Sequence, residues 1–309
     1  MRIFNSTVGR TVGAAAIAAA LLLPTQASAN LTFGSDMKID TTGIDYDNGD
    51  GNTVTDIFTQ FGFNQLLATS VYYIAEAGEG ALPDPFTPTA GDDFRLLGEF
   101  FDTNDAAKLD ALEAPTPTGS QNELTSLSPL SNSSSNLEDF NNDWFVRVFT
   151  DIEGVLTTGG PQYTGGTIRL EAFGNDIATQ TVLTFTVIGS SIQAADLNLF
   201  MNVTQAASNF LFIDDGSGNF VDISTAINDP SFPSAVLDTN VNPAIPSFGD
   251  IEESALTVGT FNDRDVAWRQ ATLDGSVGIE VPSPGPLALI GVGLFAAGVS
   301  RFGKKRKAA

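Results

Sequence analysis

Short segments that alternate apolar and polar residues recur along the middle of this chain. Residues 167–173 (TIRLEAF) place Ile, Leu and Ala on one face and Thr, Arg and Glu on the other, and residues 179–188 (TQTVLTFTVI) alternate in the same way. A period of two residues is typical of a half-buried β-strand. Glycines at 159–160, 165–166 and 174 mark turns between such segments. The chain is therefore restricted to a strand-based, antiparallel architecture.

Further strands are predicted on both sides of this region. In residues 143–156 (DWFVRVFTDIEGVL), Trp144, Val146, Val148 and Ile152 share one face. The other predicted strands are 64–74, 93–101, 197–203, 256–261, 266–272 and 276–281, together with a hairpin of 209–213 and 219–223 around the turn DDGSG. Residues 104–113 (NDAAKLDALE) carry helical spacing and predict one short helix. Many short strands with Gly, Asn and Asp turns predict an all-β, antiparallel β-sandwich or jelly-roll-like ectodomain.

Two stretches lack strand signals. Residues 114–136, which are rich in Pro and Ser, predict a long loop, and residues 228–249, which contain several prolines, predict an irregular excursion. Because the strands on both sides of residues 114–136 look alike, this stretch is interpreted as a loop within one β-domain, and a linker between two β-domains is the alternative.

Composition excludes several classes of function. All 37 acidic residues lie between residues 30 and 280, which hold seven basic residues, so this segment carries a formal charge of −30. Such a charge repels nucleic acid, and no nucleic-acid partner is expected. The chain has no Cys and no His, which excludes disulfides, Cys/His zinc sites and catalysis by Ser-His-Asp or Cys-His groups.

The N-terminus has the three parts of a secretory signal peptide. Arg2 and Arg10 form a positive region, residues 12–23 are apolar, and Ala27 and Ala29 flank a small-residue cleavage site. Residues 1–29 are therefore predicted to be removed by a signal peptidase. The mature domain would then span residues 30–280.

The C-terminal residues 281–309 have a different order. The motif Val281-Pro282-Ser283-Pro284 comes first, followed by an apolar run over 287–299, which can be extended to residue 302, and then the basic tail Lys304, Lys305, Arg306 and Lys307. A helix of 16 residues would be about 24 Å long, short against a hydrocarbon core of about 30 Å but able to span it if the bilayer thins. The sequence predicts a single transmembrane helix with its basic tail in the cytoplasm.

Motif, apolar run and basic tail together resemble a PEP-CTERM sorting signal of Gram-negative bacteria. Ser283 stands where the family's eponymous Glu would be. The resemblance implies that a membrane exosortase recognises and cleaves this segment, so that the membrane anchor is transient; a plain single-pass anchor is the alternative. The strand-rich middle also loosely resembles flocculation-associated PEP-CTERM proteins. These resemblances lead us to expect a non-enzymatic protein of the cell surface or extracellular matrix. It would be structural or adhesive and act in biofilm or floc formation, with exopolysaccharide or other surface proteins as partners.

The acidic segment DYDNGDGNTVTD contains one candidate metal site. Asp45, Asp47, Asp50 and Asp56 offer the oxygen ligands that calcium prefers. Their spacing departs from an EF-hand loop, because Asp50 stands where that loop requires glycine. The segment is thus either a calcium loop of another kind or a solvated acidic turn, and no other cofactor is expected.

The sequence leaves two alternative functions open. A secreted polysaccharide hydrolase would need a pair of carboxylates, and the many Asp and Glu residues do not single out one pair. A calcium-dependent carbohydrate-binding module would use the acidic segment just described. Trp144 and Trp268 are interpreted as core residues, with sugar stacking as the alternative.

Overall fold

The structure is a computed structural model that describes residues 34–76, 96–113, 128–130, 136–157, 160–193, 196–227, 234–242 and 256–280. The predicted signal peptide with Ala27 and Ala29, the sorting motif 281–284, the apolar run and the basic tail 304–307 lie outside these residues, as does most of the predicted loop 114–136. Within the described ranges, no helix combines the length and the apolar character needed to cross a membrane.

Most described residues belong to β-strands. The helical elements are short: η1 (Thr41–Ile44), α1 (Ala106–Leu109) and α2 (Ile223–Ala226). The strands are β1 (Met37–Ile39), β2 (Gln60–Ile74), β3 (Leu96–Thr103), β4 (Leu112–Glu113), β5 (Ser128–Leu130), β6 (Trp144–Thr157), β7 (Gly160–Gly174), β8 (Gln180–Gln193), β9 (Asp196–Ala206), β10 (Leu211–Asp214), β11 (Phe220–Asp222), β12 (Ser234–Asn242), β13 (Thr257–Phe261) and β14 (Arg264–Glu280). The predicted all-β, antiparallel architecture is confirmed.

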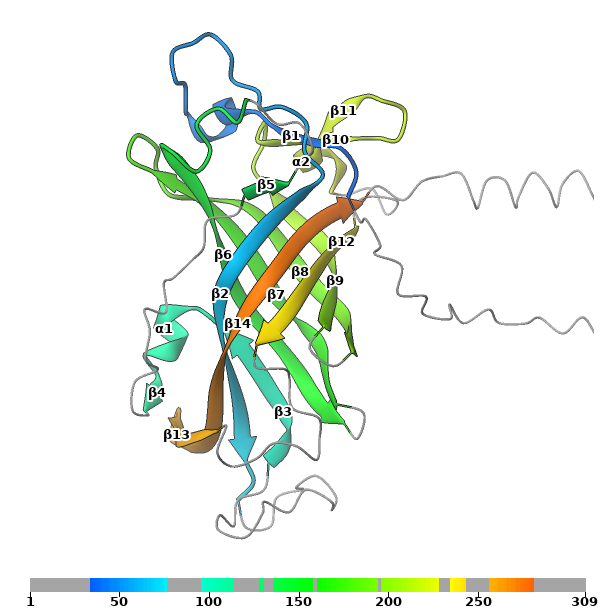
Figure 1. The fold of residues 1–309 in the computed structure, drawn as a ribbon. Coiled ribbons are helices and arrows are strands. Elements are labelled where there is room, and N and C mark those ends of the chain that lie inside the picture. Colours follow the sequence, from blue (N-terminus) through cyan, green and yellow to red (C-terminus); the bar gives the residue numbers. More distant parts are fainter. Residues whose placement is uncertain are drawn as a thin grey trace, which may run out of the picture. The chain divides into compact units, whose positions relative to one another are not determined.

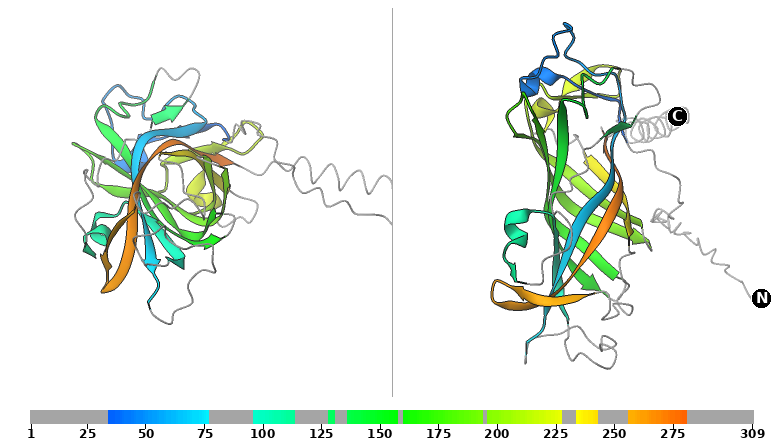
Figure 2. Two further views of the ribbon diagram at one scale, coloured as in Figure 1. Left: turned by 60° about the horizontal axis from the view of Figure 1, so that its bottom comes forward. Right: turned by 60° about the vertical axis from the view of Figure 1, so that its left-hand side comes forward.

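The long strands form one sheet that closes on itself. Their order is β14-β12-β9-β8-β7-β6-β3-β2, and β14 also pairs with β2, which completes a ring. The left view of Figure 2 shows this curvature, and Figure 1 shows β2 (blue) beside β14 (orange). Each strand of the ring pairs with the next one along the chain, so the connection is a meander rather than the crossing connection of a jelly roll.

Smaller elements attach to this closed sheet. Among the described residues, β1, β10 and β11 form a second sheet. The predicted turn joins β10 to β11, and within it Asp215 N donates a hydrogen bond of 3.0 Å to Asn219 O. Strands β13 and β4 extend the large sheet beside the first half of β14. In Figure 1 the small sheet lies at one end of the long strands and β13 with β4 at the other.

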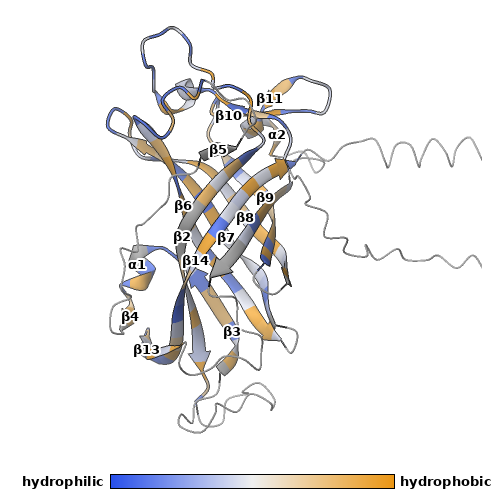
Figure 3. Ribbon diagram, viewed as in Figure 1, coloured by the Kyte–Doolittle hydropathy of each residue, from blue (hydrophilic) through white to orange (hydrophobic). Residues whose placement is uncertain are grey.

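Alternation of side chains explains why these strands form the ring. In β6 every second residue from Trp144 to Leu156 is buried, and all of these except Gly154 place a side chain inside the sheet. Phe145, Arg147 and Phe149 lie on the outer face and are only half-buried. Figure 3 shows the corresponding alternation of hydropathy along the strands. The predicted shared face of Trp144, Val146, Val148 and Ile152 is confirmed, since all four are at most 4 % exposed. The inward rows pack face to face in one core.

Charged side chains cover part of the outer face of β6 and β7. Glu171 accepts hydrogen bonds from Arg147 Nη2 and from Arg169 Nε, both at 2.9 Å. Both guanidinium groups also lie over the Phe149 ring, at 5.0 and 4.7 Å from its centroid. The Arg147–Glu171 and Phe149–Arg169 contacts join directly paired residues of β6 and β7 and so support this register on the solvent side.

Two glycines permit the close approach of strands. A Cβ at Gly154 would lie 2.6 Å from the Phe100 ring, which packs over that glycine in the core. A Cβ at Gly275 would lie 2.0 Å from the backbone oxygen of Asp238, and the β14–β2 register shifts beside this glycine. Both positions therefore require a residue without a side chain.

Two predictions about individual segments need correction. The short helix predicted over 104–113 is present but is limited to a single turn, α1, because Leu112 belongs to β4 and packs in a second cluster with Phe261 and Phe101. The predicted irregular excursion 228–249 contains β12, which pairs with both β9 and β14. The prolines at 230, 233, 243 and 246 flank β12 without interrupting it.

Candidate functional site

The four aspartates of the predicted calcium site are held in separate local turns. Asp45 ends η1 with a positive φ of 56°, and Asp47 accepts a 2.7 Å hydrogen bond from Gly49 N. Asp50 accepts from Asn52 N at 2.7 Å, whereas Asp56 exchanges two hydrogen bonds with the backbone of Asn136. No three Cys, His, Asp or Glu side chains in the described ranges are arranged to hold a metal ion. Calcium binding therefore stays a prediction.

Two of these residues face an acidic hollow of about 320 Å³. Asp45 and Asp47 line it together with Asp139, Asp143 and Asp176, and with Tyr46 and Asn48. The Tyr46 hydroxyl lies 3.1 Å from Asp139 Oδ2 and 3.2 Å from Asp143 Oδ2. Burial and these neighbouring carboxylates raise the pKa of Tyr46, so the phenol stays protonated and donates to the acidic side chains. The hollow thus concentrates negative charge beside the start of β6.

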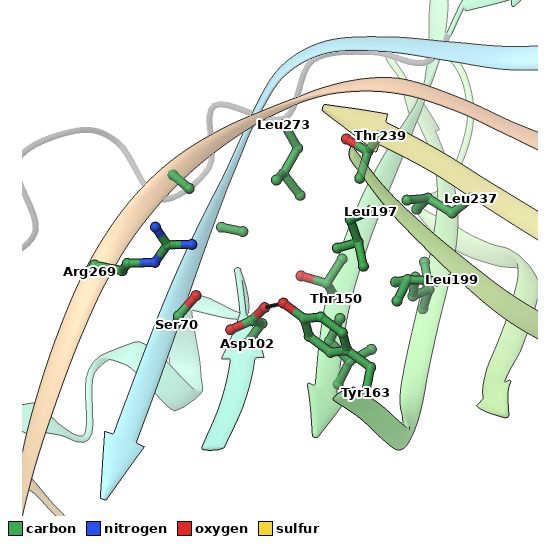
Figure 4. Close-up of a pocket in the computed structure, with 14 residues that line it drawn as sticks. Ser70, Asp102, Thr150, Tyr163, Leu197, Leu199, Leu237, Thr239, Arg269 and Leu273 are labelled. Carbon is green, nitrogen blue, oxygen red and sulfur yellow. Dashed lines mark hydrogen bonds between the residues drawn. The ribbon is translucent and has the colours of Figure 1, made fainter. Parts of the chain in front are cut away.

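A second polar cluster lies inside the closed sheet. Arg269 on β14 pairs with Ser70 on β2, and Ser70 pairs with Asp102 on β3, so these three residues form one row across neighbouring strands. Because all three occupy inward positions, each is at most 6 % exposed. Thr150 on β6 and Tyr163 on β7 complete the cluster, as Figure 4 shows.

Hydrogen bonds link the acidic residue of this cluster to its neighbours. The Tyr163 hydroxyl donates to Asp102 Oδ2. Burial raises the pKa of Asp102, although the hydrogen bond from Tyr163, the nearby Ser70 side chain and the charge of Arg269 oppose that rise. Burial and the adjacent carboxyl raise the pKa of Tyr163 well above its ordinary value. The cluster therefore holds the phenol proton on Tyr163 and makes Asp102 a weaker acid than an exposed aspartate.

The cavity beside this cluster is small. Its volume is about 20 Å³, and apolar side chains such as Ile168, Leu199 and Leu237 form much of its wall. The aromatic rings of Tyr72, Phe100 and Tyr163 pack in series nearby, with centroids 5.5 and 5.2 Å apart. A sugar ring or an organic cofactor needs a far larger space, so this interior site does not fit such a substrate.

Sequence reasoning did not single out Asp102, Tyr163 or Arg269. One signal was available for Arg269, which stands between the inward residues Ala267 and Ala271 in a predicted strand. A charged side chain at an inward position of a strand is unusual enough to mark a buried polar site. The two tryptophans were interpreted correctly as core residues, since Trp144 is fully buried and Trp268 is 6 % exposed.

No protein-family model, curated protein or solved structure matches this chain.

Proposed function

We propose that this chain is an exported structural or adhesive protein of a Gram-negative cell surface or extracellular matrix. A signal peptidase would process the N-terminus and an exosortase-type enzyme would process the motif 281–284, so that membrane anchoring through residues 287–302 is transient. The sandwich-like ectodomain would then act in biofilm or floc formation together with exopolysaccharide. The order of motif, apolar run and basic tail in the sequence supports this route.

One structural observation supports a role at the surface of the domain. Among the described residues, apolar side chains pack in a core inside the closed sheet, and the cavity beside the polar cluster measures only about 20 Å³. We therefore infer that partners of ordinary size bind the outside of the domain, where the described acidic side chains other than Asp102 and Glu138 are at least partly exposed. A packed core with a highly charged exterior suits a protein that acts through its surface.

Divalent cations would mediate the proposed adhesion. A segment of formal charge −30 repels both another copy of itself and an acidic polysaccharide. Calcium binds carboxylate oxygens, and the acidic hollow places five aspartates around one space. Calcium would thus reduce the repulsion and bridge carboxylates on two partners.

The experiment is calcium titration of the mature segment 30–280, followed by light scattering and by retention on the host's exopolysaccharide. Millimolar calcium is expected to increase both signals, and a chelator is expected to reverse the increase. Asp47→Asn, in the hollow, should weaken the response more than Asp263→Asn, which changes an exposed turn residue outside the hollow. An unchanged signal over the whole titration would refute cation-mediated adhesion.

The acidic hollow also favours a second candidate, a calcium-dependent carbohydrate-binding module. In that case calcium would raise the affinity for a defined oligosaccharide without increasing self-association. The hydrolase alternative gains no support from the Asp102–Tyr163 pair, because the cavity beside it cannot accept a sugar.

A further inference from the structure

Two buried oxygen atoms of the interior cluster have no hydrogen-bond partner within the part of the chain that the structure describes. They are Asp102 Oδ1 and Thr150 Oγ1. Asp102 is 6 % exposed and Thr150 is 4 % exposed, so bulk water does not solvate either group freely. Buried polar atoms in native proteins are nearly always satisfied by protein or by an ordered water, because leaving one unpaired costs about 1–3 kcal/mol.

Both residues line the same cavity, which is large enough for one small molecule. A buried water needs about 10–15 Å³ and two to four polar partners. The cavity of about 20 Å³ meets the first requirement, and its polar lining from Ser70, Asp102, Thr150 and Arg269 meets the second. Figure 4 draws Ser70 and Arg269 on one side of Asp102, and Thr150 and Tyr163 on the other.

We propose that this interior site binds one ordered water molecule. The water donates a hydrogen bond to Asp102 Oδ1 and accepts one from the Thr150 hydroxyl, which leaves its second proton for another acceptor of the lining. Asp102 Oδ2 already accepts from Tyr163, so the water completes the hydrogen bonds of the carboxyl group. The site thereby connects β3, β6 and β7 through side chains as well as through the backbone ladder.

The charges around the site favour water over a cation. Arg269 is close enough for its charge to lower the pKa of Asp102, and the same charge repels a sodium ion placed beside that carboxylate. An anion is disfavoured by Asp102 itself. A neutral molecule that both donates and accepts hydrogen bonds fits this pair of neighbours.

The direction in which one substitution changes the stability of the protein tests the proposal. Thr150→Val keeps the shape of the side chain and removes its hydroxyl. If the hydroxyl is unpaired, valine relieves a buried polar group and stabilises the protein. If the hydroxyl holds a water, valine weakens the water's site and leaves Asp102 Oδ1 unsatisfied, so the folding equilibrium constant should fall about fivefold to tenfold.

The matched control is Thr150→Ser, which keeps the hydroxyl and removes one methyl group. A high-resolution crystal structure of the wild-type mature segment should show one well-ordered water within hydrogen-bond distance of Asp102 and Thr150. The serine variant should keep this water and the valine variant should lose it. The wild-type density decides the question even if the valine variant fails to fold.

Three outcomes would overturn the proposal. They are an empty site in the wild-type density, a valine variant that is more stable than wild type, and ligand distances near 2.4 Å, which indicate a bound cation.

Discussion

Replacing Tyr163 by phenylalanine removes a single hydroxyl from the interior of the closed sheet. The ring keeps its edge-to-face contact with Phe100, whose centroid lies 5.2 Å away. Asp102 loses the phenol that donates to its Oδ2 atom. The substitution therefore isolates one buried hydrogen bond from the packing of the aromatic ring.

The size of the effect depends on the charge of Asp102. A hydrogen bond to a neutral group contributes about 0.5–1.5 kcal/mol, and one to a charged group contributes about 1.5–3 kcal/mol. We expect Tyr163→Phe to lower the free energy of unfolding by about 1 kcal/mol when Asp102 is protonated and by about 2 kcal/mol when it is ionised. For a domain of this length, 2 kcal/mol lowers Tm by about 4–8 °C.

The direction of the pH dependence follows from the raised pKa of Asp102. Because the folded protein holds this proton more tightly than the unfolded chain, the stabilising contribution of Asp102 is complete below its unfolded pKa of about 3.9 and is lost as pH rises through its folded pKa. Tyr163 opposes the rise in that pKa. Its removal should therefore cost least at acidic pH, and the cost should grow as pH increases.

Urea unfolding at several pH values between about 4 and 8, followed by the fluorescence of Trp144 and Trp268, measures this difference. The control is Tyr73→Phe, since Tyr73 is half-buried against Phe101 outside the cluster. Its cost should not change over the same pH range. A Tyr163→Phe cost that is independent of pH, or that stays below about 0.5 kcal/mol, would refute this account of the cluster.

Three other substitutions are expected to affect the folded structure to different extents. Trp144→Ala should cost about 3–5 kcal/mol in urea unfolding, because the indole is fully buried and stacks on a phenyl ring 4.3 Å away. Gly275→Val should separate β12 from β14, since its side chain would overlap the Asp238 carbonyl, and faster amide exchange confined to β12 would reveal this. Glu171→Gln should cost less than about 1 kcal/mol, because its two arginine partners are 30 % and 40 % exposed; a larger loss that persists at high salt would contradict this expectation.

Local patterns were enough to predict the strands that build the meander. In β6, β7 and β8 apolar side chains alternate with polar ones because one face of each strand is buried, and this alternation can be seen in the sequence. Strand β12 was missed because prolines stand on both sides of it. Its pairing with β9 and β14 stabilises an extended segment that propensity alone does not indicate.

Contacts between residues that are distant in the sequence could not be predicted from local patterns. The row of Arg269, Ser70 and Asp102 exists because three strands distant in sequence pair in a particular register, and no local pattern specifies that register. The predicted calcium segment shows the opposite difficulty. Its aspartates are close in sequence, yet two of them face a hollow completed by Asp139, Asp143 and Asp176, which come from later parts of the chain.

The pairing of β2 with β14 also determines when this protein can finish folding. Gln60 pairs with Gly278, and Ser35 N donates to Ile279 O over 2.9 Å, so the first and last parts of the described chain meet. The meander can grow from neighbouring strands at small entropic cost, whereas joining its two ends closes a loop of roughly 200 residues and comes last. During synthesis or export, β2 keeps an open edge that can pair with other chains until β14 arrives. In the proposed export route, the sorting segment directly follows β14, so the ring can close only as the chain reaches the point where it is to be cut.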